Sequence, residues 1–539
     1  MLYNINSMDV TKNALISVYN KDGIEDFAKN LVELGWTLWA SGGTATKLTK
    51  AKIPVNDVAE LVGGKAILGH RVVTLSREIY AGLLATDSPA DTKELKTLGI
   101  PRIDLVCVDL YPLQDEIMRE GSTVDSVIEQ TDIGGPTLLR AAAKGKRIVI
   151  SLPEQRSNVI EWLRQNKPDE TKFLANLAAT AEAVVARYAL ASAHYHSNGG
   201  FNGEISILSA KAAYGENPWQ ERAVLYGQSP AGALSLVLFQ QLQGSSPSYN
   251  NYCDFDRLLQ TITHIAAGWD VNFGEVPSIA VGGKHGNACG AAVDANPQVA
   301  IKKMLEGDLR AIFGGIVMVN FPIDAEIAEI LLLHKVEKGR RLLDAVIAPS
   351  FTDEALELLK RKKDKCRILV NPALLNLDKN SLDTAPRTRY VRGGKLVQDN
   401  YTFVLDLKQS YVEKTNQANE KDLVLGWAIG STSNSNTISI VKDSALIGNG
   451  VGQQDRVGAA ELAVKRAKDA GHKIKGASAY SDSFFPFADG PKVLADEGVV
   501  SILSSSGSLG DEDVKAEMKK AGVALYLVPD KLARGFYSH

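Results

Sequence analysis

The chain has 539 residues, and its 60 Lys and Arg against 63 Asp and Glu give a formal net charge of −3. This balance argues against a nucleic-acid-binding protein, which would carry a basic excess. The content of 45% apolar and 23% charged residues is typical of a folded globular chain rather than a disordered one. Residues 1–9 lack a basic segment followed by an apolar one, and apolar runs such as 236–239 and 311–319 are too short to span a bilayer. We therefore expect a cytoplasmic protein of more than one domain, with no membrane or nucleic-acid partner.

The N-terminal segment alternates strand and helix patterns. Residues 14–18 form an apolar run typical of a buried strand, and apolar residues then recur at 24, 27, 28, 31 and 32, the spacing of one helix face. A second predicted strand, 37–40, runs into the loop Ser41-Gly42-Gly43-Thr44 and a helix from about residue 45. This order predicts an α/β fold with a doubly wound parallel sheet.

The loop 41–44 fits two interpretations. Its glycines let the backbone approach an anion, Ser41 and Thr44 offer hydroxyls, and the following helix directs N–H groups to the same place, so the loop can bind phosphate. A glycine turn that only joins a strand to a helix is equally compatible with these residues.

A second glycine loop follows a predicted strand over 104–110 that ends in Tyr111-Pro112. This loop, 132–136, opens a helix that runs through Arg140 to Lys144, and the two cations share one helix face. With Asp132 just before the helix they could form a buried acid–base site, although the residues alone favour a surface ion pair.

An Ala-rich helix is predicted over 172–196, and the glycine-rich break at 198–203 is the strongest domain boundary in the sequence. We predict a first domain over residues 1–200 and a second over residues 201–539.

The second domain carries three candidate site segments. Lys284-His285 lies at a glycine-flanked strand end, where the ammonium can keep the imidazole neutral and able to accept a proton; the alternative is an ordinary surface dipeptide. The glycine-rich stretch 448–456 enters a helix and is a candidate phosphate loop with Arg456 as its cation. Residues 484–487 include three phenylalanines, which suit either core packing or a wall for a flat heterocycle.

Metal binding is not indicated. The four cysteines are scattered with no CxxC pair, and the eight histidines form no HExxH pattern. We predict no metal site and no metal cofactor.

Taken together, the motifs resemble one known family, the bifunctional purine biosynthesis enzymes. These join an inosine monophosphate (IMP) cyclohydrolase domain to an aminoimidazole carboxamide ribotide (AICAR) formyltransferase domain. The resemblance covers nearly the whole chain in the right order. The motifs that carry it are the Ser41 loop, Leu110–Pro112, Asp132–Lys144, Tyr214–Pro218, Lys284-His285, Phe313–Gly315, Gly393–Asp399, Gly448–Arg456 and Phe484–Phe487.

The resemblance implies a fold and a set of ligands. The first domain would be methylglyoxal-synthase-like, and the second would consist of two cytidine-deaminase-like α/β halves. No zinc-deaminase signature is present, so zinc chemistry is not implied. The implied co-substrate is 10-formyltetrahydrofolate, the other ligands are AICAR, formyl-AICAR and IMP, and the assembly is a homodimer with transformylase sites between subunits.

The resemblance also implies residue roles. In formyl transfer His285 would be the base, with Lys284 and Asn436 stabilising the tetrahedral intermediate. The ribotide or folate would be positioned by the matching residues Tyr214, Asn251, Asp344, Phe484 and Asp489, and the phosphate held by Arg456 and Arg534. In ring closure the acid–base and oxyanion help would come from Asp132, Lys144 and Tyr111, and the phosphate site from Ser41, Gly42, Gly43, Thr44 and Arg71.

Several positions depart from the family pattern. Val73 stands where the family has a catalytic lysine, and Ser76 and Tyr80 stand where it has histidines. In the second domain Ala213 replaces a phosphate-binding arginine and Trp219 a histidine. Because valine can neither carry charge nor donate a hydrogen bond, its presence could reduce ring closure by roughly 10²–10³-fold.

Three functional hypotheses follow. The leading one is AICAR formyl transfer with IMP cyclohydrolase activity retained or reduced. The second is a transformylase whose first domain only binds ribotide, and the third is a non-catalytic, ligand-binding relative.

Overall fold

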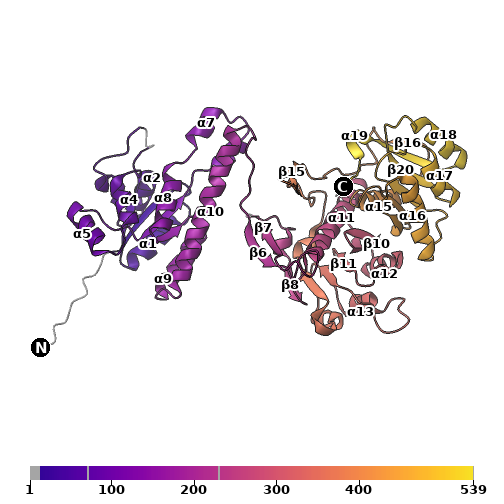
Figure 1. Ribbon diagram of the computed structural model, residues 1–539, viewed down its shortest axis with the longest axis horizontal. Helices are drawn as coiled ribbons and strands as arrows, with labels where there is room; N and C mark the ends of the chain where they lie inside the picture. The colour runs from indigo at the N-terminus through magenta and orange to yellow at the C-terminus, as the bar shows by residue number, and fades with distance from the viewer. Residues whose placement is uncertain (1–11, 69–71, 229–230, 538–539) are drawn as a thin grey trace. The chain divides into compact units, whose positions relative to one another are not determined.

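The computed structural model describes residues 12–68, 72–228 and 231–537, so Arg71 lies outside the described residues. The chain divides into two compact units, Met1–Ile205 and Ser206–His539 (Figure 1). The division falls just beyond the glycine-rich segment 198–203.

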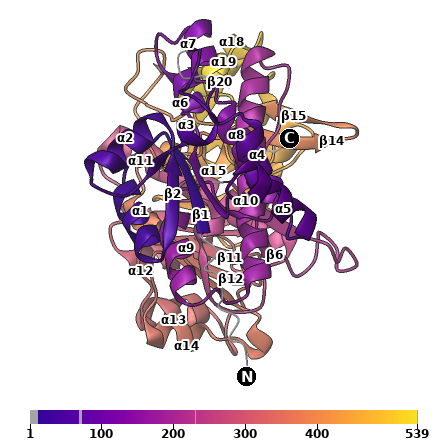
Figure 2. The ribbon, with the colours of Figure 1, turned by 90° about the vertical axis from the view of Figure 1, so that its left-hand side faces the viewer.

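The first unit is built on a parallel sheet. Its strand order is β3-β2-β1-β4-β5, which confirms the predicted doubly wound fold. Helices α1, α2 and α9 lie to one side of the sheet, and α4, α8 and α10 to the other (Figure 2). The strands are β1 Lys12–Val18, β2 Trp36–Ala40, β3 Asn56–Asp57, β4 Leu105–Asp109 and β5 Ile148–Ile150. The helices are α1 Ile24–Glu33, α2 Gly42–Lys50, α3 Val58–Leu61, α4 Arg77–Leu84, α5 Pro89–Leu98, α6 Leu113–Met118, α7 Val124–Glu129, α8 Gly134–Lys144, α9 Gln155–Arg164 and α10 Glu170–His196.

The winding places a topological switch point between β1 and β4. In sheets of this order the chain leaves β1 toward one edge and returns to β4 on the other side, and ligands bind where the carboxyl ends of these strands part. The loops after β1, β2 and β4 all open at this edge.

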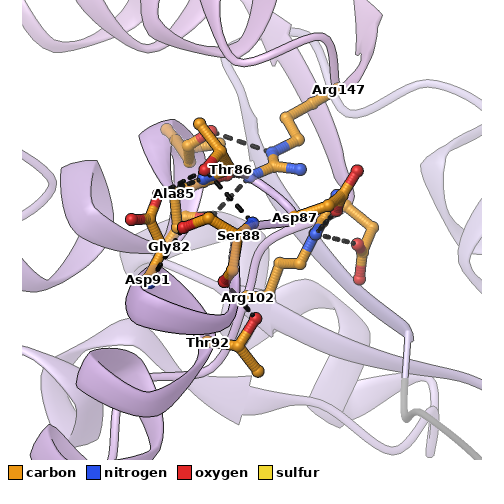
Figure 3. Close-up of polar contacts among 11 residues, drawn as sticks. Gly82, Ala85, Thr86, Asp87, Ser88, Asp91, Thr92, Arg102 and Arg147 are labelled. Carbon is orange, nitrogen blue, oxygen red and sulfur yellow. Dashed lines mark hydrogen bonds and ion pairs between the residues drawn. The ribbon is translucent and has the colours of Figure 1, made fainter.

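Helix α4 is fixed tightly to its surroundings (Figure 3). The buried Arg147 guanidinium donates to the carbonyls of Leu83, at 2.8 Å, and of Ala85, near the end of α4 where carbonyls have no helical partner. A Cβ on Gly145 would lie 2.0 Å from the Leu83 oxygen, so only glycine fits this approach. The segment that contains Ser76 and Tyr80 is therefore rigidly placed.

Helix α10 is the one helix in the described part of the chain that is long and apolar enough to cross a membrane by length and composition. It packs along α8 and β5, and Arg140 on α8 is paired with Glu182 on α10 at 3.2 Å. These contacts give α10 the role of a sheet-covering helix of the first unit.

The second unit has a twelve-stranded mixed sheet in the order β16-β21-β20-β19-β17-β18-β10-β9-β11-β12-β13-β8. Its strands are β8 Gln240–Gln243, β9 Ser278–Lys284, β10 Asn287–Asp294, β11 Ile316–Val319, β12 Ala345–Ala348, β13 Arg367–Val370, β16 Glu413–Lys414, β17 Ile438–Lys442, β18 Ala445–Gly450, β19 Ser478–Ser481, β20 Ser501–Ser506 and β21 Ala524–Pro529. Two separate hairpins are formed by β6 Ile207–Lys211 with β7 Val224–Gly227, and by β14 Arg387–Val391 with β15 Gly394–Gln398.

This sheet is made of two similar halves. Each half runs helix, antiparallel hairpin, helix, strand, helix, strand, helix, strand. The first half uses α11 Tyr249–Phe273, α12 Pro297–Gly307, α13 Ala325–Leu333 and α14 Asp353–Leu359, and the second uses α15 Glu420–Gly430, α16 Arg456–Asp469, α17 Asp489–Asp496 and α18 Asp511–Ala521; α19 Asp530–Ala533 follows. The halves meet where β10 pairs with β18 and where α11 packs on α15. The expected pair of α/β halves is present.

Candidate active sites

The first candidate site lies at the carboxyl edge of the parallel sheet. After β1, the backbone N–H of Asn20 donates to the Asp109 carboxylate at 2.8 Å, which fastens this loop to the end of β4. Lys21 then reaches across to the glycine loop, since a Cβ on Gly43 would lie 3.2 Å from its Cε atom. This cation, three residues after the first predicted strand, was not among the predicted site residues.

Part of the glycine loop 41–44, its two glycines, has the geometry of an anion site. Helix α2 begins at Gly42, three residues earlier than predicted, so both glycines lie in its first turn, and the Ser41 side chain makes no capping bond there. N–H groups at such a turn favour a phosphate. Thr44 is only 3% exposed and its hydroxyl bonds to the Val18 backbone, so it fastens the loop to β1 instead of facing a ligand.

Asp132 is held in a compact turn before α8. Its carboxylate accepts the N–H of Gly135 at 2.8 Å and further N–H bonds from Gly134 and Tyr111. Burial nevertheless raises the pKa of this carboxyl above that of an ordinary aspartate. An added Cβ on Gly135 would lie 2.4 Å from the Asp132 carboxylate, so any larger residue there would displace this side chain.

Lys144 does not join Asp132 within one chain. The two residues flank opposite ends of α8, which at 1.5 Å per residue is about 15 Å long. Arg140, which the sequence placed on the same helix face, pairs instead with Glu182 of α10. The surface ion pair that the residues alone favoured is therefore present, and the alternative acid–base cluster along α8 is not assembled within this chain.

The departures in the segment before and within α4 have structural roles. Val73 packs against the hydrophobic core of the first unit, and the Ser76 hydroxyl accepts the Ile79 N–H at 3.3 Å as the helix cap. Burial raises the pKa of Tyr80 above the usual tyrosine range, so its hydroxyl stays protonated. These residues complete the fold around the site without supplying a cation.

The second candidate site is centred on the turn between β9 and β10. Lys284 and Asn287 are paired across a two-residue turn whose central residues, His285 and Gly286, have φ of 53° and 72°. Such a turn matches the twist of the flanking strands and projects the exposed His285 from the sheet. Lys284 Nζ donates to the Phe313 carbonyl at 3.0 Å, which joins two of the predicted motifs.

Asp254 on α11 supports this turn and was missed in the sequence. Its carboxylate accepts the Gly286 N–H at 2.6 Å and also the backbone N–H of His285. Burial raises the pKa of Asp254. The only signal in the sequence is its place one helical turn after Asn251.

Replacing Asp254 with asparagine is expected to lower kcat for formyl transfer by about 10-fold, because one acceptor that holds the His285 turn is exchanged for a donor. The KM for ribotide should change little, since the change affects placement of the base. Steady-state kinetics would measure the split. The matched control is Cys253→Ala at the adjacent exposed position, and an unchanged kcat in Asp254→Asn would contradict the assignment.

A second network joins this turn to Asn436. The Asn287 side chain accepts the Asn434 N–H at 3.1 Å, and Asn434 in turn accepts from the Arg257 guanidinium. The side-chain amide of Asn436 donates a hydrogen bond to the Gln453 carbonyl at 2.9 Å, which fixes its position. The loop that carries Asn436 is therefore tied directly to the Lys284-His285 hairpin.

The buried Asp482 gathers three further predicted elements. It accepts the Thr437 N–H at 3.0 Å, lies 3.4 Å from the Arg456 guanidinium, and its carbonyl accepts the Gly535 N–H. Burial raises the pKa of Asp482 to about 6. Asp482 thus holds Arg456 and the C-terminal segment next to the loop that carries Asn436. Arg534 lies in this C-terminal segment and is paired with Asp530.

The start of α11 is docked by the 213–220 loop. The carbonyl of Tyr214 accepts the Tyr249 N–H at 2.9 Å. Asn251 accepts from the Ser248 N–H at 3.0 Å as part of the helix cap, one turn before Asp254. Ala213 and Trp219 are exposed on the loop, and Trp219 has 77% of its surface open.

Other predicted residues lie at the margins of the second site. The N–H of Asp344 donates to the Gly315 carbonyl, which ties it to the Phe313 loop, and its carboxylate pairs with Arg361 at 3.0 Å. Phe484 is half-buried just after Asp482 and Ser483, and Asp489 is exposed at the start of α17.

The glycine-rich entry to α16 does not have the expected form of a phosphate cradle. The Asp455 carboxylate already accepts the Gly458 N–H at 2.7 Å at this helix start. An anion that belongs to the chain therefore occupies the position that a phosphate would take. Arg456 lies beside Asp482 and remains the candidate cation for a substrate phosphate.

A cavity of about 280 Å³ opens beside the hairpin turn. Its walls are formed by the turn, by the end of α12 and by α16 with β18; the polar residues among them are Lys284, His285, Asn287, Asp308, Asn449 and Arg466. No group of three His, Cys, Asp or Glu suited to a metal ion is found among residues 12–68, 72–228 and 231–537.

Comparison with known proteins matches both units. The sequence model of the AICARFT/IMPCHase bienzyme family matches residues 142–466, and that of the MGS-like domain matches residues 23–137. The bifunctional purine biosynthesis protein PurH of Anoxybacillus flavithermus is 36% identical over 529 residues, which cover 95% of this chain and 98% of that protein. PurH of Thermoanaerobacter sp. is 36% identical over 530 residues, covering 96% and 98%.

Among solved structures, "Crystal structure of ForH" is 32% identical, and the match covers 35% of this chain and 100% of that one with a TM-score of 0.32. The near-complete, collinear match to the PurH proteins, together with the family model, places this chain in the AICARFT/IMPCHase bienzyme family.

Proposed function

We propose that this protein catalyses both steps of its family, transfer of a formyl group from 10-formyltetrahydrofolate to AICAR and closure of formyl-AICAR to IMP. The observation that carries the proposal is the Lys284-His285 turn, which presents an exposed imidazole beside an ammonium fixed on the Phe313 carbonyl. Family membership extends the proposal to the first unit.

Formyl transfer requires a base and charge stabilisation. The amino nitrogen of AICAR attacks the formyl carbon, His285 accepts the proton from that nitrogen, and negative charge develops on the formyl oxygen. Lys284 and Asn436 stabilise this oxygen in the tetrahedral intermediate. The intermediate then collapses as the C–N bond to the folate breaks and the folate nitrogen takes up a proton.

Ring closure places different demands on the first unit. The carboxamide nitrogen attacks the formyl carbon, the new C–N bond closes the six-membered ring, and water leaves. Asp132 and Tyr111 lie together at the sheet edge for proton transfer and oxyanion help, and Lys21 with the Ser41–Gly43 loop would hold the ribotide phosphate.

We further propose that the enzyme is a cytoplasmic homodimer. Lys144 is exposed at the far end of α8 from Asp132, so a second copy is the means by which this lysine could reach a site. The hairpin β14–β15 is also largely exposed and carries apolar side chains, with Tyr390 80% and Leu396 61% open, as expected of a surface that another subunit covers.

The two steps can be measured separately on one preparation. With AICAR and 10-formyltetrahydrofolate the protein should form IMP, and with synthetic formyl-AICAR alone it should again form IMP. If formyl-AICAR accumulated without ring closure, the proposed cyclohydrolase activity would be refuted and only the transformylase activity would stand. Ligand binding by calorimetry with no turnover in either assay would refute both activities.

A further inference from the structure

Tyr188 lies in the C-terminal half of α10, and its hydroxyl is hydrogen-bonded to the backbone at both Gln130 and Asp132, just before α8. The Asp132 N–H donates to the Tyr188 oxygen at 2.6 Å, and the same hydroxyl donates to the Gln130 carbonyl at 3.0 Å. One side chain thus satisfies a donor and an acceptor in the short connection between α7 and α8. The two contacts join segments 56 and 58 residues apart in the sequence.

The turn is consequently held from two directions. Tyr188 fixes the backbone of Asp132, while the N–H groups of Gly134, Gly135 and Tyr111 fix its carboxylate. A partly buried backbone N–H that loses its partner costs free energy, and the turn would adjust to recover one. The orientation of the Asp132 carboxylate therefore depends on the phenol.

The helix that carries Tyr188 is packed against the rest of the first unit. Tyr188 is part of α10, which packs along α8 and is joined to it by the Arg140–Glu182 ion pair. Burial raises the pKa of Tyr188 to about 12, so the hydroxyl keeps its proton and its ability to donate. The ionisable groups that act on it are Asp132 and Tyr111.

We infer that Tyr188 is a positioning residue of the ring-closing site, acting through Asp132 and not on the substrate. The inference rests on the proposed IMP cyclohydrolase activity. Its hydroxyl proton and the lone pair facing the turn are both engaged by the backbone, so its effect on the reaction is to set where the Asp132 carboxylate lies.

The test uses Tyr188→Phe in the full chain. This variant keeps the ring and removes one oxygen. We expect kcat for closure of supplied formyl-AICAR to fall by about 10-fold, the size of effect expected when a buried hydrogen bond that orders the site is lost. The KM should remain within about twofold, and formyl transfer by the second unit of the same chain should not change, which reports that the variant is folded.

Two further variants separate positioning from general loosening of α10. Tyr195→Phe removes a hydroxyl from the same helix, one that makes no hydrogen bond within the described residues, and should close the ring at the parent rate. In an Asp132→Asn background, Tyr188→Phe should lower the residual rate by less than about twofold, because residues that act as one unit are non-additive.

The outcomes are distinguishable. If the parent chain does not close formyl-AICAR, the proposed function fails and the inference fails with it. If the parent chain closes the ring and Tyr188→Phe does so equally well, only the inference fails. The inference would also be overturned if Tyr188→Phe lowered kcat by 10-fold both in the parent chain and in the Asp132→Asn background. Tyr188 would then act independently of Asp132.

Discussion

Replacing His285 with alanine is expected to lower kcat for formyl transfer by about 10³-fold, within the range expected for removal of a general base. The imidazole is exposed at the tip of the β9–β10 turn, and the group beside it, Lys284, cannot accept a proton while it is an ammonium donating to Phe313. Closure of supplied formyl-AICAR by the first unit should be unchanged. A coupled assay of each step on the same sample measures both.

The backbone at this position calls for a second variant. His285 has a φ of 53°, which alanine adopts at some cost and asparagine adopts readily. His285→Asn therefore retains the turn and still lacks the base, and it should lose as much activity as His285→Ala. His194→Ala, at an exposed position in the first unit, is the matched control. Formyl transfer within tenfold of the parent rate in His285→Asn would contradict the role of the imidazole.

The parts of the fold that the sequence predicted are those governed by local pattern. The apolar run at 14–18 became β1, a strand buried along most of its length, and the predicted strand at 37–40 became β2, in which buried and half-buried residues alternate. The Lys284-His285 turn was also visible locally, as a charged pair beside glycines at a strand end. In each case the residues that identify the feature lie within a few positions of one another.

The site residues that were missed depend on contacts between distant segments. Asp254, Lys21 and Tyr188 each act on a loop that another element carries, and Tyr188 looks like any aromatic residue of an Ala-rich helix. Only the packing of α10 against the rest of the first unit brings its hydroxyl within hydrogen-bond distance of the Asp132 N–H.

At two motifs the spacing left alternatives open, and contacts with residues outside the motif bear on them. The spacing of Arg140 and Lys144 correctly predicted a shared helix face, but α8 runs away from Asp132, and Glu182 from α10 takes Arg140. At the glycine-rich stretch before α16, the decisive residue is Asp455, whose carboxylate caps the helix start that a phosphate was expected to occupy. A glycine-rich helix start indicates a position that favours an anion, but it does not show whether that anion is a ligand or a carboxylate of the chain itself.

Replacing Asp132 with asparagine is expected to lower ring closure by about 10²–10³-fold and to leave formyl transfer unchanged. Asparagine retains an oxygen for the Gly135 N–H, so this bond of the turn is kept while the proton-accepting group is lost. The matched control is Asp125→Asn, an exposed acid in the first turn of α7. Equal ring closure by Asp132→Asn and the parent chain would exclude the carboxylate from the chemistry.

The pH dependence of ring closure tests the same group without mutation. Burial raises the pKa of Asp132, so the carboxyl becomes protonated at a higher pH than an ordinary aspartate as the solution is acidified. If the ionised carboxylate is the active form, kcat should decline on the acid side at a pH above the usual aspartate range, and this limb should vanish in Asp132→Asn. Burial raises the pKa of Tyr111, so this phenol ionises on the alkaline side and cannot produce the acid limb. An acid limb that survives in Asp132→Asn would assign the proton transfer to another residue.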